Sequence, residues 1–183
     1  MIISSAGLPS RGTHLMKRDT LFYLNRKEKE IIYREFQAQL DRLLENNIVP
    51  THIDSHHHYH TEWAIGKKAI KLAKKNNISA VRLARNIGAD TNKVNSVYRN
   101  LYNFNIMRNG LARVKYFGSI NDVLVDFERN KKVLNDVEVM VHPQFTQDGE
   151  LIDDISTDQK ILLDSQVKKL ETMIPQATLA SYE

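Results

Sequence analysis

Short apolar segments alternate with amphipathic segments along this chain, and the alternation restricts the possible folds more than any other feature. In the amphipathic segments, apolar residues recur at helical spacing with charged residues between them. We expect helices at residues 27–46, 62–75, 91–109 and 119–134, and after Ser156. We expect strands at residues 48–54, 78–83, 137–141 and 177–182. Strands and helices that alternate with short connections are typical of βαβ units, so we predict an α/β protein with a mainly parallel sheet.

Polar residues mark several ends of these segments. The pairs Asn46-Asn47 and Asn76-Asn77 are expected to end the first two helices. Ser119 is the expected N-cap of the helix at 119–134, and a serine also precedes the last helix. The last helix is expected to carry Ile161, Leu162, Val167, Leu170 and Met173.

The length of the chain limits the size of the sheet. With 183 residues and no internal repeat or linker, we predict a single domain over residues 1–183. A closed eight-stranded β/α barrel takes about 250 residues. The sheet is therefore either small and open or an incomplete (β/α) barrel. Residues 1–24 contain no clear strand–helix unit, which favours a barrel whose N-terminal β/α elements are missing.

Composition excludes several classes of site. The chain has no cysteine, so disulfides, thiolate metal sites and cysteine nucleophiles are excluded, and a reducing cytoplasm is the expected location. No run approaches the roughly 20 apolar residues of a membrane span. The net charge of +4 comes from residues scattered over helix faces, without zinc-finger spacing or a stacking-aromatic motif, so we expect no nucleic-acid partner.

A cluster of histidines is the strongest chemical signal. The run THIDSHHHYH at residues 51–60 holds five of the seven histidines, beginning in a predicted strand and passing its carboxyl end. Ligand sites of parallel β/α folds lie at such strand ends, and imidazole with carboxylate is the ligand set of divalent metals. The residues of one strand parity could share a face while extended geometry lasts: His52, Asp54, His56, His58 and His60. We favour metal binding or catalysis over an adventitious metal-binding loop or hydrogen-bonded strand-end histidines.

Other candidates have weaker signals. His142 follows the strand at 137–141, where an acid–base role and a capping role are equally open. Arg82 and Arg85 bracket the end of the second strand, where a surface position is expected and orientation of a carboxylate is the less favoured alternative. For Trp63 and Phe145, core packing is favoured over stacking on a sugar ring.

The THIDSHHHYH run resembles the T-H-[LI]-D-S-H-H-H-x-H block of the YdjC-like carbohydrate deacetylases, the family of chitooligosaccharide deacetylase. The segment VRLAR at 81–85 resembles that family's V-R-[LI]-P-R segment, with Ala84 where proline is usual. The segment VEVMVHP at 137–143 resembles its [LV]-E-[LV]-M-x-H-P block, and LASY at 179–182 its closing strand. The resemblance covers residues 20–183.

This resemblance implies a hydrolase that removes N-acetyl groups from N-acetylated sugars or oligosaccharides, on an incomplete β/α barrel with a divalent metal, magnesium or zinc. In the family, an Asp from D-D-F-G, a His from G-x-H-[LF]-x-L-T and the first His of the H-H-H run hold the metal. By position the last of these is His56. His142 resembles the acid that protonates the leaving amine, and Arg82 or Arg85 would orient the base. Four further residues would line the pocket or support the metal ligands: His52, Asp54, His58 and His60.

Two family motifs are not matched. The sequence has no D-D-F-G, and the nearest string to the second motif, GTHL at 12–15, directly precedes a D-x-x-F-[YF] stretch at 19–23 that lies well downstream in the family. His14 is therefore assigned to the intervening loop. The chain resembles a family member without its first two β/α elements, so we expect weak metal binding and little or no deacetylation.

Two alternatives stay open. One is a non-catalytic remnant that binds sugars or assembles as a homo-oligomer, because missing elements leave strand edges and apolar faces that need a partner. The other is a metal-dependent hydrolase of another amide or ester, which a fold alone does not exclude.

Overall fold

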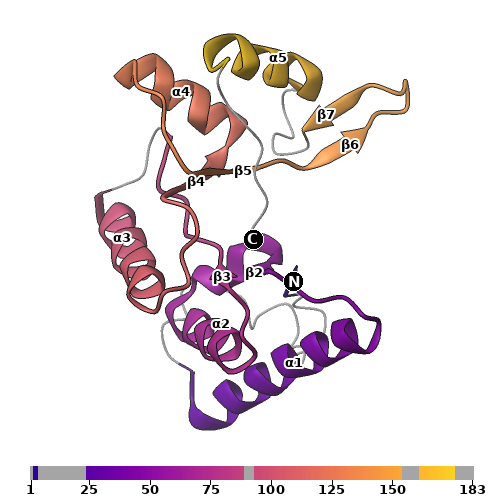
Figure 1. Ribbon diagram of the computed structural model, residues 1–183, viewed down its shortest axis with the longest axis vertical. Coiled ribbons are helices and arrows are strands. Elements are labelled where there is room, and N and C mark those ends of the chain that lie inside the picture. The colour runs from indigo at the N-terminus through magenta and orange to yellow at the C-terminus, as the bar shows by residue number, and fades with distance from the viewer. Residues whose placement is uncertain (1, 4–23, 89–92, 154–160, 176–183) are drawn as a thin grey trace. The chain divides into compact units, whose positions relative to one another are not determined.

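The computed structural model describes residues 2–3, 24–88, 93–153 and 161–175. The chain divides into two compact units, coloured along the sequence in Figure 1. The first unit consists mainly of Met1–Ala84 and Val97–Arg113, and the second of Arg85–Ser96 and Val114–Ser181. Each unit is described by itself.

A small parallel sheet forms the centre of the first unit. Its strands are β1 (Ile2–Ile3), β2 (His52–Ser55) and β3 (Ala80–Val81), in that order. β2 pairs in parallel with both neighbours. The parallel arrangement confirms the prediction, but β2 and β3 are shorter than the predicted strands at 48–54 and 78–83. Residues 48–50 precede β2, and Pro50 has no N–H for a ladder hydrogen bond.

Two predicted helices pack side by side in the first unit (Figure 1). Helix α1 (Arg26–Glu45) begins at a capping box in which Asn25 and Glu28 exchange 2.9 Å hydrogen bonds. Its buried residues recur every four positions, at Ile32, Phe36 and Leu40. Helix α2 (Trp63–Lys75) fully buries Ala69, Leu72 and Ala73. Both helices confirm their predicted ranges to within one residue at each end, because strong amphipathic periodicity fixed them.

Helix α3 (Lys93–Arg108) has apolar residues on two faces. One face buries Tyr102, Asn103 and Ile106. The other face leaves large apolar side chains exposed: Val94, Val97, Leu101, Phe104 and Met107. This distribution explains why the helix, although correctly predicted, has a weak amphipathic pattern.

The second unit contains one parallel strand pair joined by a helix. β4 (Tyr116–Ser119) pairs with β5 (Val137–Met140) from Tyr116↔Val137 to Ser119↔Met140. Helix α4 (Ile120–Asn130) connects them, and Ser119 forms its N-cap, which confirms that prediction. β4 was not predicted. The helix ends four residues earlier than predicted because Lys131 adopts a left-handed conformation, with φ of 51°.

An antiparallel sheet follows, which the sequence did not predict. It consists of β6 (Pro143–Phe145), β7 (Leu151–Asp153) and β8 (Ile161–Leu162). Ile161 and Leu162 therefore belong to a strand, and the last helix, α5 (Leu163–Met173), begins after them. Helix α5 packs against α4 (Figure 1). The predicted cap Ser156 and the predicted strand at 177–182 lie outside the described residues.

The observed elements make an α/β fold with small parallel sheets, as predicted. None of the helices among the described residues is both long enough and apolar enough to cross a membrane.

Candidate functional site

The histidine run leaves the sheet at Ser55 and turns at once. Residues His56–Thr61 form a 3-10 helix, η3, which we call the histidine turn. Extended geometry ends before His56, so the alternate histidines do not continue the strand face of His52 and Asp54. The strand-parity expectation was wrong from that point onward. His58 has a left-handed φ of 57°, which breaks the extended path inside the turn.

His60 lies fully buried at the end of the histidine turn. Its Nδ1 atom lies 2.6 Å from the hydroxyl oxygen of Ser55, and its backbone N–H donates to the same oxygen at 2.8 Å. Because that hydroxyl already accepts one hydrogen bond, its own proton is available to Nδ1. If Nδ1 accepts this proton, a neutral His60 carries its ring proton on Nε2; if Nδ1 carries the ring proton, the second lone pair of the hydroxyl oxygen accepts it.

The protonation state of His60 follows from its surroundings. Burial, with smaller contributions from the charges of His58 and Arg82, lowers the pKa of His60 from 6.5 to about 3. The ring is neutral at physiological pH. Its Nε2 atom has no hydrogen-bond partner among the residues that the structure describes. His60 is therefore part of the scaffold and is not poised to exchange protons near neutral pH.

A buried ion pair lies beside His60. Arg82, just after β3, donates from Nη1 to Oδ2 of Asp54 on β2, and the two side chains are only 16% and 13% exposed. The other carboxylate oxygen, Oδ1, lies 3.5 Å from Nδ1 of His60. The expectation of a surface position for Arg82 was wrong, because parallel pairing of β2 with β3 brings its side chain to the neighbouring strand's carboxylate.

Two tyrosines of helix α3 donate hydrogen bonds to backbone carbonyls of the histidine turn. The Tyr102 hydroxyl donates to the carbonyl of His60, and the Tyr98 hydroxyl donates to the carbonyl of Thr61 at 2.7 Å. Asn103 binds both backbone groups of Ala84, accepting its N–H at 2.7 Å and donating to its carbonyl at 2.9 Å. A proline at 84, usual in the resembled motif, has no N–H to donate.

Two of the sequence candidates lie in the second unit. His142 follows β5 and is half exposed; its backbone N–H donates to Oδ1 of the buried Asp153 at 2.9 Å, and its Nδ1 lies 3.7 Å from that oxygen. Arg85 is 45% exposed and pairs through Nη2 with Asp122, which is 3% exposed. Asp153 was missed because only the fold of β7 brings it to His142.

The remaining candidates separate into exposed and enclosed residues. His56 is exposed at the start of the histidine turn, whereas His52 and His58 are half-buried. Phe145 is 70% exposed, so its predicted core position is wrong. Trp63 is half-buried, and Lys67 Nζ lies 5.1 Å from the centre of its ring, a cation–π contact.

The described residues do not form a complete metal centre. No three histidine, aspartate or glutamate side chains gather closely enough within the described ranges to hold an ion. The carboxylate of Asp54 is already paired with Arg82, and the ring of His60 is buried against Ser55. His56 has an exposed imidazole at the start of the histidine turn, and it fits the role of a single ligand.

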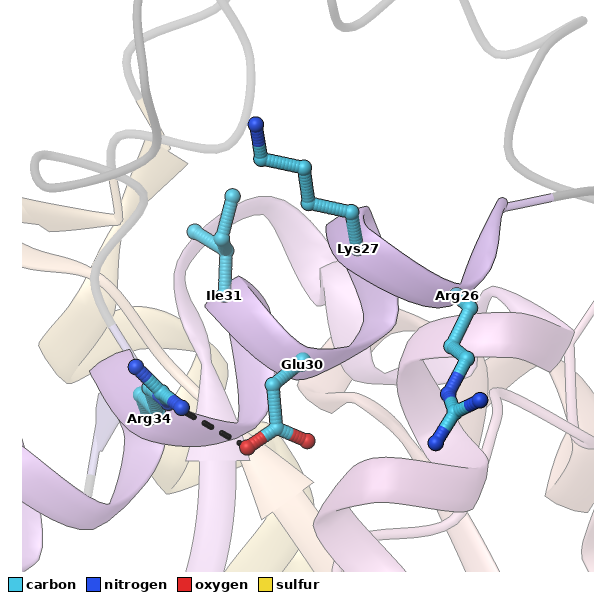
Figure 2. Close-up of a pocket in the computed structure, with 5 residues that line it drawn as sticks. All are labelled: Arg26, Lys27, Glu30, Ile31 and Arg34. Atoms are coloured by element: carbon cyan, nitrogen blue, oxygen red, sulfur yellow. Dashed lines mark hydrogen bonds and ion pairs between the residues drawn. The ribbon is translucent and has the colours of Figure 1, made fainter.

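Two surface hollows have measurable volumes, and none of their described lining residues belongs to the histidine turn. The described residues that line one of them, of about 450 Å³, all belong to α1 and include Arg34 and Glu30, whose side chains approach to 3.2 Å (Figure 2). The described residues that line the other, of about 260 Å³, are Trp63 and Ala64 with three lysines. No histidine of the described ranges lines either hollow, so we place the candidate site at the strand end.

The fold and the polar strand ends together define an α/β protein of the kind that places its site at the carboxyl ends of parallel strands. The sequence profile of the YdjC-like protein family matches residues 5–180, and the chain belongs to this family.

Two curated relatives are named carbohydrate deacetylase. The protein from Clostridium beijerinckii is 30% identical over 156 residues, which is 79% of this chain and 53% of that protein. The protein from Vibrio parahaemolyticus is 36% identical over 66 residues, 36% of this chain and 26% of that protein. The chain thus spans about half the length of the first relative and about a quarter of the second.

Proposed function

We propose that this chain acts in carbohydrate deacetylation, as a metal-dependent hydrolase that removes N-acetyl groups from N-acetylated sugars or oligosaccharides in the cytoplasm. The observation that carries the proposal is the end of β2. There a buried pair, Asp54 and Arg82, stands beside a histidine turn that presents His56 to solvent. The names of the two curated relatives support the same reaction class. An incomplete β/α barrel is the architecture that we propose for the chain.

In this proposal the acid is His142. Its ring is half exposed, and the Asp153 carboxylate accepts its backbone N–H, so the main chain that carries the imidazole is held in place. Protonation of the departing amine is a step that a histidine side chain commonly performs as a general acid. We propose that Arg82 holds the carboxylate of Asp54 in place and that Arg85 orients a base.

A divalent ion, magnesium or zinc, remains part of the proposal, with His56 as one ligand. The described residues lack the other ligands of a complete centre, and we therefore assign the ion no step of the reaction. Weak binding and slow or absent turnover are expected for the same reason.

The test uses the chain itself with oligomers of N-acetylglucosamine. We expect the chain to bind the N-acetylated oligomers more tightly than the deacetylated ones, as measured by ligand-observed NMR. Any acetate released in the presence of Mg²⁺ or Zn²⁺ is expected to disappear in His142→Ala. Equal affinity for acetylated and deacetylated oligomers, without acetate release, would contradict the proposal. Rapid turnover would contradict only the expectation of low activity.

A non-catalytic assembly or sugar-binding protein is the second candidate, and one observation favours it. On α3, five apolar side chains on one face are exposed: Val94, Val97, Leu101, Phe104 and Met107. An exposed apolar face of this kind is typical of a surface that another element covers. Light scattering after size exclusion tests the assembly: a homo-oligomer that Leu101→Glu converts to monomer supports it, and a monomeric parent chain contradicts it.

A further inference from the structure

We propose that Ser55, His60 and Tyr102 are positioning residues that hold the histidine turn against the sheet, and that none of the three binds substrate or metal. This proposal deepens the proposed function, on which it rests for the importance of the turn. The three residues form what we call the Ser55–His60–Tyr102 cluster. The sequence comparison drew attention to His60 as a pocket residue but gave no role to the other two.

Hydrogen bonds between Ser55 and His60 close a short loop of main chain at the end of β2. Ser55 is the last residue of β2 and has an extended backbone, with φ of −142° and ψ of 146°. Its side-chain oxygen contacts both the backbone N–H and the Nδ1 atom of His60, five residues later. Two hydrogen bonds to one oxygen fix the position and the rotation of His60. The chain between them must therefore turn tightly, and His56 leaves the strand in one defined direction.

Tyr102 on α3 holds the backbone of His60 by a second contact. The carbonyl of His60 accepts the Tyr102 hydroxyl, and Tyr102 is itself almost fully buried. Gly66 on α2 makes this approach possible. A Cβ atom at that position would lie 2.5 Å from Cε2 of Tyr102 and 2.6 Å from the His60 carbonyl oxygen. Glycine is unfavourable inside a helix, so its presence here has a packing reason.

The surroundings of His60 determine its chemistry. Its ring is enclosed, with Asp54, Arg82 and His58 as the charged or titratable neighbours that face it. The ring of His58 stands edge-on at 6.3 Å between centroids. With Nδ1 occupied by the Ser55 hydroxyl and the side chain wholly buried, the ring has no exposed atom for a ligand. The His60 side chain therefore positions the turn through its hydrogen bond to Ser55.

The first experiment needs no substitution. In a long-range ¹H–¹⁵N spectrum of the full chain, without metal or sugar, we expect His60 to hold a single tautomer, because the Ser55 hydroxyl fixes its Nδ1 atom in a buried position. A ring that exchanges between its two tautomers, as a solvated imidazole does, would overturn the proposal. Since no sugar or metal takes part, this result is independent of whether the chain deacetylates anything.

The second experiment uses matched substitutions and amide hydrogen exchange. Loss of the Ser55 acceptor in Ser55→Ala is expected to reduce the protection of the His60 amide by about tenfold, as for one ordinary hydrogen bond. Ser55→Thr keeps the hydroxyl and is expected to keep the protection. His60→Asn places an amide oxygen where Nδ1 lies, whereas His60→Gln places its polar atoms farther out, so Asn is expected to preserve the order of the turn better than Gln.

The outcomes separate the positioning role from the proposed activity. Unchanged exchange in Ser55→Ala, or equal behaviour of His60→Asn and His60→Gln, would overturn the positioning role. Tyr102→Phe provides an independent arm: we expect faster exchange in the turn with unchanged exchange in α1. Failure of deacetylation with the expected exchange pattern would count against the proposed function alone.

Discussion

The segment at 81–85 contains two arginines that face two different carboxylates. Arg82 belongs to the first unit and pairs with Asp54, and both side chains are largely enclosed. Arg85 belongs to the second unit and pairs with Asp122, but its own side chain is nearly half exposed. Asp122 has further donors, because the Ser119 N–H and hydroxyl also bind its Oδ2. One carboxylate thus depends on a single guanidinium, whereas the other has a second set of partners.

The difference teaches that adjacent positions in a motif need not have equivalent roles. Removing the partner of an enclosed charge leaves an uncompensated charge, which is far more destabilising than the loss of a solvated ion pair. The pair at Asp54 also adjoins the histidine turn, while the pair at Asp122 lies at the start of α4. Four predictions test this contrast.

The largest expected effect follows from Arg82→Met. Asp54 would lose its charged partner in an enclosed position, and we expect the free energy of unfolding to fall by about 3–5 kcal/mol. Urea denaturation measures this change. The double variant with Asp54→Asn removes the stranded charge and is expected to recover part of the loss. A fall of less than about 1 kcal/mol would show that the pair is effectively solvated.

The second prediction concerns how stability depends on pH through His60, which lies beside Asp54. The folded pKa of His60 is about 3, below the unfolded value of 6.5, so the unfolded chain binds more protons between these values. The stability from this group is therefore complete above pH 6.5 and is lost as the pH falls toward 3, by up to about 1.4 kcal/mol per pH unit. Urea midpoints from pH 7 to 4.5 measure it. His60→Asn is expected to flatten the profile, and an equally steep profile in that variant would assign the effect elsewhere.

The third prediction concerns the additional partner on the Asp122 side. Ser119→Ala removes the hydroxyl that accepts the Asp122 N–H at 3.2 Å and that donates to its carboxylate. We expect a loss of about 1 kcal/mol, as is usual for an N-cap. Thermal unfolding followed by circular dichroism measures it, with Ser119→Thr as the control that keeps a hydroxyl able to accept and to donate. No loss in Ser119→Ala would mean that Arg85 alone sustains Asp122.

The smallest effect is expected for Arg85→Met. Asp122 is enclosed, but its carboxylate keeps the Ser119 N–H and hydroxyl as donors, so we expect a loss of about 1 kcal/mol, well below that of Arg82→Met. The same urea titration as for Arg82→Met measures it. If the two arginine variants lose equal stability, the contrast between the two pairs is wrong.

Much of the helical framework was predictable from the sequence. α1 and α2 have strong periodic burial, and the spacing of Ser119 and Asp122 matches a capping box that can be recognised without a structure. The family was also predictable, because the THIDSHHHYH run is long and specific, and the match over residues 5–180 confirms it.

The geometry of the candidate site was much less predictable. The alternating pattern of the histidine run predicts a continued strand, whereas the Ser55 side chain accepts the His60 N–H and the chain turns there. The contacts of Tyr102 and Asp153 join residues 42 and 11 positions apart, and no local pattern records such pairs. Local rules predicted elements and caps, but the supporting polar contacts depend on tertiary packing.

The two hydrogen bonds from Asn103 to Ala84 have a mechanical consequence. Ala84 is the last residue of the first unit before the chain passes to Arg85. The amide of Asn103 thus anchors the main chain where it leaves the first unit, two residues after Arg82. We expect a pulling force applied at Arg85 to act on these two hydrogen bonds before it acts on the two-residue β3.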